Sequence, residues 1–521
     1  MVSIEFLLAA LPFVLLFVLI VGIKWSVLKA MPLVWFLTML MVFFVWKVDF
    51  VLISASFVKG ILVAGEIVLI IFGAIWVVQI IKEKKHMKDL QSFLSLISED
   101  ARVQVLIIAW LFGSLIEGVA GFGTPAMLVA PLLVSLGFAP VLAVVLSLIA
   151  NSTAVSFGAA GLPVILGIGS LGFENLLGDL TKNVAIFHGL ASLVVPLFLV
   201  YFVCSHYSGK NVWRSFFAVL PFALFAWLAF IVPYFLIAWF LGPELPTIVG
   251  GIVGLFLVVG GAKIGFLVPK KKLTIGKSRR VARVGHKSMF LALFPYFLVV
   301  LLLFLSRTIG SLKAKLSSVS VGWESIFGSG VSYGFLPFFT PAFYFFVVGV
   351  ASLFIFNAGW RDFSSSLGKS WKRVRLPALA LVFALALVQL LLVSGDGSVG
   401  LGSVPVVLAQ GVSGVFENGF VLVSPLVGAF GSFLTGSNTV SNLLFGSFQV
   451  ESAKLLGISL VLVLSLQVVG GAVGNMIAIH NVLAASSSVG LYGVTGKIIR
   501  KTIVVSLLYA LIVGFLGLLL F

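Results

Sequence analysis

Long apolar runs, separated by short polar or basic segments, dominate the chain. A helix that crosses a bilayer needs about 20 mostly apolar residues, and roughly a dozen segments reach or approach that length. The clearest are residues 6–22, 32–46, 60–81, 184–204, 216–240, 247–268, 289–306, 331–356, 376–393 and 502–521. This pattern predicts an all-α polytopic membrane protein with roughly 12 or more transmembrane segments. No small-residue cleavage site follows the first run, which predicts a retained helix rather than a signal peptide.

Two stretches of the chain repeat each other at a separation of 318 residues. FGSLIEG at residues 112–118 returns as FGSFLTG at 430–436, and VLSLIANSTAV at 145–155 aligns with VLSLQVVGGAV at 463–473. An internal repeat in so apolar a chain is typical of secondary transporters, which bind their substrates where the repeats meet.

The repeat divides the chain into four expected parts. They are N-terminal transmembrane helices (1–85), a first repeat unit (86–204), scaffold helices with basic cytoplasmic loops (205–401), and a second unit with a terminal helix (402–521).

Composition supports the membrane class. The 521 residues are 61% hydrophobic and 9% charged, with a mean hydropathy of +1.26, which excludes an ordinary soluble domain. The single cysteine, Cys204, excludes an internal disulfide and a multi-cysteine metal site. No cofactor is expected.

The net charge of +17 raises the question of a nucleic-acid partner. The positive residues are concentrated in short loops between spans, chiefly 270–287 and 361–375, as the positive-inside rule describes. This distribution favours contact with lipid headgroups and no nucleic acid, with a specific polyanion partner as the alternative.

The same loops predict the topology. Lys24 and Lys29 put the first loop inside and the N-terminus outside, and the basic residues before the last span put the C-terminus outside. The first unit then begins inside and the second outside, which makes the repeat inverted. This inversion requires residues 404–419, and their counterpart 86–101, to be interfacial amphipathic segments rather than spans.

The first unit contains a glycine-rich break, EGVAGFGTP, at residues 117–125. Three glycines and a proline do not fit one continuous helix, and irregular backbone at membrane depth must face protein or a water-filled cavity. We expect a re-entrant hairpin or broken helix whose free N–H groups suit an anion. The candidate binding residues are Gly121, Phe122, Gly123 and Thr124. A packing kink without a ligand is the alternative.

The second unit has its break at residues 435–442, TGSNTVSN, where six hydroxyl or amide side chains lie within eight residues. Such groups both donate to a carboxylate and accept from a hydroxyl. A plain Ser/Thr-rich turn is the alternative interpretation. The candidate binding residues here are Thr435, Ser437, Asn438, Thr439 and Asn442.

Each unit has a second polar interruption downstream. Asn151, Ser152 and Thr153 precede a glycine-rich segment in the first unit, and Asn475 ends the GGAVGN string at 470–475 in the second. We expect both to be unwound segments that line the site.

Ionisable residues inside spans are functional candidates by default. Glu117 opens the first break and is the leading candidate for proton coupling, with His480 as the second. The alternatives are that Glu117 only caps the hairpin, that His188 and His480 are satisfied core histidines, and that Glu451 pairs with Lys454. Glu66 lies on an otherwise apolar helix.

The chain resembles the bacterial lactate permease family. The similarity runs through most of the chain in the motifs FGSLIEGVAGFGTPA (112–126), LGFAPVLAVVLSLIANSTAVSFGAAGLPV (136–164), GPELP (242–246), FLTGSNTVSNLLFGSFQ (433–449) and GGAVGNMIAIHNVLAASSSVGL (470–491). The resemblance implies carriage of L-lactate, D-lactate or glycolate with protons, and an inverted-repeat fold with two re-entrant hairpins.

One position departs from that family. The family pattern reads TGSDT where this chain has TGSNT, so Asn438 replaces a carboxylate. The string Ser437-Asn438-Thr439 is also similar to the hairpin tips of sodium-coupled dicarboxylate transporters, which keeps sodium coupling open.

We therefore expect a secondary transporter of the plasma membrane that takes up lactate and related anions with protons. A sodium-coupled symporter and an anion channel are the alternatives. An embedded enzyme is disfavoured, because no two of the six aspartates lie close in sequence and the five histidines show no HExxH spacing. The sequence leaves homo-oligomerisation open.

Overall fold

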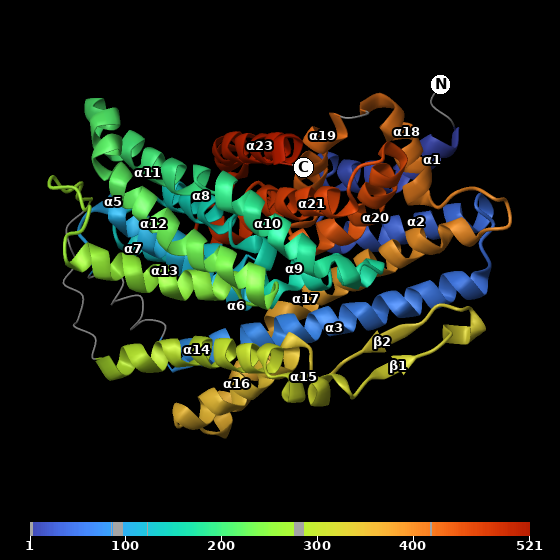
Figure 1. The fold of residues 1–521 in the computed structure, drawn as a ribbon, viewed down its shortest axis with the longest axis horizontal. Coiled ribbons are helices and arrows are strands. Elements are labelled where there is room, and N and C mark those ends of the chain that lie inside the picture. Colours follow the sequence, from blue (N-terminus) through green and yellow to red (C-terminus); the bar gives the residue numbers. More distant parts are fainter. Residues whose placement is uncertain are drawn as a thin grey trace.

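The computed structural model describes residues 4–84, 86, 97–121, 123–275, 286–416 and 419–520, which form a bundle of helices with one two-stranded sheet (Figure 1). Among these residues, ten helices are long and apolar enough to cross a membrane, or up to 12 if each sharply bent pair is one span. The prediction of an all-α, multi-span protein is confirmed.

The N-terminal and middle parts hold the longest helices. α3, whose 34 residues include the expected span 60–81, and α17 run side by side for most of their length. The elements of these parts are α1 (Ile4–Phe17), α2 (Val27–Phe44), α3 (Phe50–Glu83), α12 (Val212–Leu241), α13 (Pro246–Lys263), α14 (His286–Thr308), α15 (Gly310–Ser317), β1 (Val321–Trp323), β2 (Tyr333–Phe335), α16 (Pro341–Ile355) and α17 (Trp360–Val393).

The helices of the first unit are shorter and more deeply buried. The eight residues Val105–Phe112 adopt the wider turns of a π-helix between α5 and α6. The elements are α5 (Ala101–Gln104), α6 (Gly113–Ala120), α7 (Thr124–Ser135), α8 (Pro140–Asn151), α9 (Gly158–Ile165), α10 (Leu177–Ala191) and α11 (Val194–Tyr207).

The second unit has the same order of parts. In both units a helix–tip–helix hairpin is followed by a helix that breaks and resumes, and then by a closing helix. The closing helices α10 and α23 begin at Leu177 and Thr495, again 318 residues apart. The elements are α18 (Val404–Phe416), α19 (Phe420–Thr435), α20 (Asn438–Leu456), α21 (Leu460–Gly474), α22 (Ile479–Ser488) and α23 (Thr495–Leu520).

The two units pack on each other reciprocally. α9 of the first contacts α20 of the second, and α22 of the second contacts α7 of the first. In the same way α10 packs on α21, and α23 packs on α8. Such an exchange is what a two-fold relation between the units produces.

Two expectations about spans change. Residues 331–356 are not one span, because β2 occupies Tyr333–Phe335 and α16 begins only at Pro341, whose ring suits the first helical position. The helix of residues 289–306 is present within α14, but the chain then turns by 92° into α15.

The segments on which the inversion depends are only partly described. Residues 404–416 form α18, whereas 417–418 and most of 86–101 lie outside the described residues. The interfacial character of these segments and the four-part division of the chain stay predictions.

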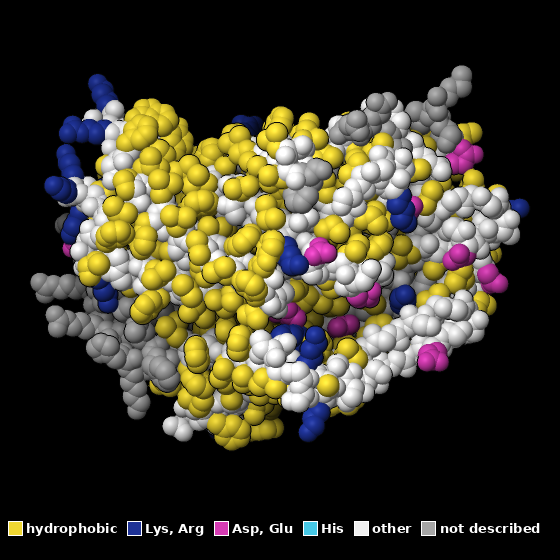
Figure 2. Space-filling view, in the orientation of Figure 1, with side chains coloured by type: hydrophobic (Ala, Val, Ile, Leu, Met, Phe, Trp, Pro, Cys, Tyr) yellow, Lys and Arg dark blue, Asp and Glu magenta, His cyan; other side chains and the backbone are white. Residues whose placement is uncertain are grey.

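Charged side chains mark the two ends of the molecule. In the face that Figure 2 shows, Lys and Arg gather mostly at the end on the left, Asp and Glu lie mostly towards the right, and a broad apolar surface lies between them. The left end holds the loop before α12 and the end of α13 (Figure 1). This separation is what a membrane protein under the positive-inside rule displays.

Inversion of the repeat is testable by labelling. Ser135 ends α7 in the first unit and Leu455 lies in the last turn of α20 in the second, and both are exposed. In a Cys204→Ser background, we expect Ser135→Cys and Leu455→Cys to react with a membrane-impermeant maleimide from opposite sides of the membrane. Labelling of both from one side would contradict the inversion.

Candidate functional site

The first break is a tight tip between the continuous helical segment Ala101–Ala120 and the short helix α7. α6 ends at Ala120, and α7 begins at Thr124 and has only 12 residues, too few to cross a bilayer. Gly121 and Gly123 have φ of +56° and +71°, in the left-handed region that favours glycine. Phe122 lies outside the described residues. The segment is therefore a hairpin that reverses within the protein.

The second break has the same form. α19 has 16 residues, Gly436 has a φ of +76°, and α20 begins immediately after Ser437. The Ser437 hydroxyl caps α20 by accepting from the Val440 N–H, and the Thr435 hydroxyl donates to the Gly431 carbonyl at 2.8 Å.

Both tips rest on the start of α22. A Cβ at Gly123 would lie 3.0 Å from Asn481 Oδ1, and one at Gly436 would lie 3.1 Å from the His480 Cβ. Asn481 Nδ2 also donates to the Gly436 carbonyl at 3.3 Å. One helix thus contacts the two hairpins.

A small cavity of about 20 Å³ lies between the breaks. Such a volume holds about one water molecule, so the protein is closed around this site. The lining comes from both units: Glu117, Gly121, Val155, Gly158, Ala159, Leu162, Pro163, Gly436, Ser437, Asn438, Thr439 and Asn475.

Glu117 is the buried carboxylate of this cavity, only 2% exposed. Its Oε2 accepts from Asn151 Nδ2 at 3.0 Å. A Cβ at Gly158 would lie 2.6 Å from Glu117 Oε1, so the carboxylate fits only because residue 158 is glycine.

The wall beside Glu117 is unwound backbone. Ala159, Ala160 and Gly161 have φ of 44°, 54° and 79°, three successive residues in the left-handed region. Two of them are alanines, for which this conformation is unfavourable and is held by the surrounding structure.

Asn438 lines the same cavity from the second unit. Its Nδ2 donates to the Val468 carbonyl at 3.0 Å, whereas its buried Oδ1 has no hydrogen-bond partner among the described residues. The same holds for the Ser432 hydroxyl, and in the first unit for the Ser114 hydroxyl and Asn151 Oδ1. Unpaired buried oxygens are costly, so their clustering behind both tips indicates a functional constraint.

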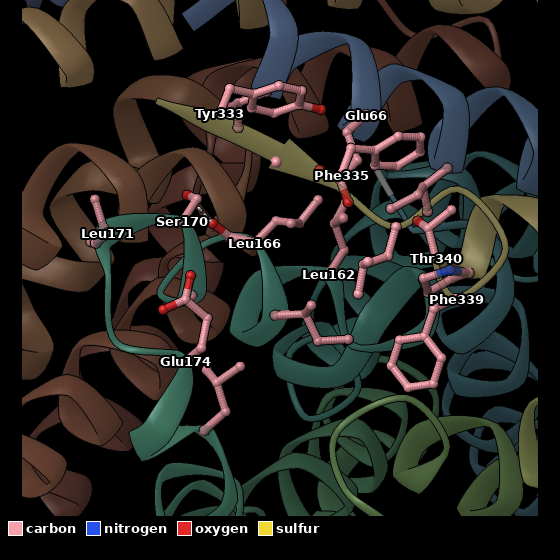
Figure 3. Close-up of a pocket in the computed structure, with 18 of the residues that line it drawn as sticks. Glu66, Leu162, Leu166, Ser170, Leu171, Glu174, Tyr333, Phe335, Phe339 and Thr340 are labelled. Carbon is pink, nitrogen blue, oxygen red and sulfur yellow. Dashed lines mark hydrogen bonds between the residues drawn. The ribbon is translucent and has the colours of Figure 1, made fainter. Parts of the chain in front are cut away.

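Two larger cavities flank the central one. The first, of about 660 Å³, is shown in Figure 3 and shares Leu162 with the central cavity. The second, of about 350 Å³, is mostly apolar and shares Gly436 and Ser437 with it. The central cavity therefore shares lining residues with both larger cavities.

Comparison with known proteins assigns this arrangement to a family. Residues 5–521 match the family model for L-lactate permease. The chain is 34% identical to a putative L-lactate permease of Haemophilus influenzae, over 90% of this chain and 89% of that protein. It is 27% identical to a glycolate permease of Escherichia coli over 98% and 95%, and 29% identical to an L-lactate permease of Bacillus subtilis over 80% and 78%.

The chain belongs to the L-lactate permease family. The resemblance read from its motifs is confirmed, and the many apolar helices make this permease a multi-pass membrane protein.

Of the residues predicted for the site of this permease, one group meets at the central cavity. It comprises Glu117, Gly121, Ser437, Asn438, Thr439 and Asn475. Asn151 joins them through its bond to Glu117, and Gly123 lies against Asn481.

The other predicted residues do not line that cavity. Ser152 donates to the Ile149 carbonyl, and Asn442 Nδ2 donates to the Pro163 carbonyl at 2.9 Å. Thr435 and His480 line the 350 Å³ cavity instead. Thr124 and Thr153 are buried outside the central lining. The binding roles themselves stay predictions.

Two interpretations left open by the sequence become clearer. Both ring nitrogens of His188 have partners, Ser156 Oγ at 2.8 Å and Tyr509 OH at 2.6 Å, which favours a satisfied core histidine. Glu451 and Lys454 pair with each other at 2.7 Å.

Sequence reasoning placed Asn481 and Gly158 in segments expected to line the site, but it did not predict their contacts. Asn481 follows His480 just after the second polar interruption, a position that drew attention to the segment but not to its contact with both tips. Gly158 belongs to a glycine-rich string, yet only the fold brings it to Glu117.

The polar groups of the second break require glycine at position 471 of this permease. A Cβ there would lie 2.0 Å from Asn438 Oδ1. We expect Gly471→Ala to lower stability by about 1–3 kcal/mol, the usual cost of overpacking, seen as a lower thermal midpoint of the detergent-purified protein. Gly189→Ala is the matched control, because a Cβ at Gly189 would meet no atom of another described segment within 4 Å. Equal midpoints for the two variants would refute this packing.

Proposed function

We propose that this permease takes up lactate and related 2-hydroxy monocarboxylates such as glycolate, together with protons, across the plasma membrane. The observation that carries the proposal is the central cavity, where a buried carboxylate and the polar start of α20 meet between two hairpin tips. Relatives named L-lactate permease and glycolate permease support this substrate class.

The start of α20 suits the substrate carboxylate. The first N–H groups of a helix lack partners within the helix and carry a partial positive charge. In α20 they lie beside Asn438 and Thr439, whose side chains can bond a carboxylate or the 2-hydroxyl group. The glycine tip opposite leaves room for close approach.

The flanking cavities suit a carrier rather than an open pore. The central cavity of about 20 Å³ is too small for a lactate ion, and each larger cavity shares lining residues with it. Small movements of the tips against α22 would open the centre to one side at a time, as in transporters with repeated units.

Glu117 is the proposed proton carrier. Its carboxylate lines the central cavity and, among the described residues, accepts a hydrogen bond from the neutral amide of Asn151. A proton on Glu117 would favour binding of the substrate anion beside it, and by linkage the anion would favour the proton. Proton and anion would then cross as a neutral pair, which avoids burying an unpaired charge.

Sodium coupling is the second candidate. It is favoured by Asn438 Oδ1 and Ser432 Oγ, buried oxygens without partners among the described residues, at the break where the family pattern has a carboxylate. Oxygen ligands of this kind suit hard cations.

The orientation is also part of the proposal. With the basic loops inside, both termini are outside, and the 660 Å³ cavity, which β2 lines, opens outward. Anionic lipid headgroups are the expected partners of the basic loops.

Substrate binding can be tested at the second break. Losing one hydrogen bond to a charged group costs about 1.5–3 kcal/mol, roughly 10- to 100-fold in affinity. We expect Asn438→Ala and Thr439→Val each to weaken binding of labelled L-lactate by that factor. Ser487→Ala, on the exposed face of α22, is the control. Wild-type affinity in both variants would remove these residues from the site.

Coupling can be tested at Glu117. Glu117→Gln mimics the protonated side chain, so we expect proteoliposomes to retain lactate exchange between equal pools and to lose uphill uptake driven by a pH gradient. Glu99→Gln, 66% exposed at its side chain, is the matched control. Accumulation by Glu117→Gln in response to pH, without sodium, would show that another group carries the proton. Uphill uptake by wild type that requires sodium would support the second candidate.

A further inference from the structure

The 660 Å³ cavity contains a cation that the proposed function does not use. Arg307, in the last turn of α14, is only 10% exposed at its side chain. Its Nε donates to Glu244 Oε1 at 2.8 Å and its Nη2 to the Phe339 carbonyl at 2.8 Å. The buried Nη1 has no hydrogen-bond partner among the described residues, so one donor of the planar fork is unused.

A second unused donor is the hydroxyl of Thr340, the residue after Phe339. Thr340 occupies the cap position of α16, where a threonine hydroxyl normally bonds the first turn of the helix. Here its side chain makes no such bond, and its buried Oγ1 has no partner in the described parts of the chain. Thr340 and Arg307 line the same cavity.

The walls around this pair are partly aromatic. Figure 3 shows Phe339 and Thr340 at one end of the cavity, Glu66, Tyr333 and Phe335 along it, and Glu174 at the other end. The guanidinium carbon of Arg307 is 3.6 Å from the centre of the Phe339 ring, which holds the guanidinium in place by a cation–π contact.

Of the charged residues that line this cavity, Arg307 is the one placed to bind an anion. Lys59 and Glu174 lie close enough to interact electrostatically, and Glu244 occupies one edge of Arg307. Glu66 is a further carboxyl group of the cavity wall, and in its ionised form it repels an entering anion.

We infer that Arg307 and Thr340 form a second binding site for a small monocarboxylate, at which the substrate stops in the 660 Å³ cavity before it reaches the central site. A carboxylate pairs with a guanidinium through two parallel hydrogen bonds, which Glu244 does not use. A carboxylate bound at the free Nη1 shares the positive charge of Arg307 with Glu244 and so weakens that ion pair. This inference rests on the proposed function.

Movement of Glu244 would change the packing around the first break. Glu244 belongs to the GPEL segment, and a Cβ at Gly161 would lie 2.5 Å from the Pro243 carbonyl oxygen. Gly161 is the last of the three left-handed residues beside Glu117. An anion at Arg307 thus loosens the loop that packs on the unwound backbone of the central site.

The test compares substitutions on the two partners of the ion pair. In oriented proteoliposomes, with L-lactate exchange measured from the side of this cavity, we expect Arg307→Gln to raise KM about 10-fold or more. Glu244→Gln removes the competing carboxylate and should lower KM several-fold. Glu66→Gln removes a repelling charge and should also lower KM, and Thr340→Val should raise it.

A double variant separates binding from folding. Arg307→Gln alone leaves Glu244 buried without its partner, which can unfold the protein. Glu244→Gln/Arg307→Gln replaces the ion pair by two neutral amides and leaves no unpaired charge. We expect its KM from the same side to stay raised about 10-fold, with the thermal midpoint near wild type and KM from the opposite side unchanged.

Different results would contradict the second site and the proposed function. If the ion pair only holds the loop, both single variants shift KM in the same direction. A normal KM in the double variant, with weakened binding in Asn438→Ala, would remove the second site and leave the proposed function. If the wild type does not exchange lactate, both fail.

Discussion

The arrangement of this permease follows from one constraint: backbone groups released by a helix break have no partner in lipid. Two hairpin tips and two unwound segments interrupt the described helices at the centre, and the structure packs all four together. Side-chain amides supply the missing bonds. Asn442 reaches the Pro163 carbonyl in the other unit, and Asn481 reaches the Gly436 carbonyl. The central cavity therefore lies where interrupted backbone can be packed inside the protein.

Close approach of helices is the second requirement, and glycine meets it in the second unit. A Cβ at Gly428 would lie 2.3 Å from the Gln467 carbonyl oxygen, and one at Gly470 would lie 2.0 Å from that of Pro425. Small residues at such contacts let helix backbones pack closely in membranes. Most glycines of the string at 470–475 thus serve the contact of α21 with α19, and Asn475 is the member that reaches the cavity.

The repeat, the spans and both breaks could be predicted because each leaves a local or periodic record in the sequence. Proline, glycine and polar residues inside apolar runs locate Gly121 and Gly436 without a structure. Pairings between distant positions leave no such record. The contacts of Arg307 with Glu244 and of Asn481 with the two tips emerge only from the fold. The span expected over residues 331–356 is wrong because β2 and the segment before α16 are nearly as apolar as a helix.

The contact of α22 with both tips has a consequence for energy conservation. A carrier that admitted solvent from both sides at once would discharge the gradient that drives it. Because Asn481 bonds the Gly436 carbonyl and lies against Gly123, a shift of one tip changes the support of the other. In the proposed gradient-driven carrier, this shared support would couple the two tips, so resistance to ion leak would depend on the side-chain amide of Asn481.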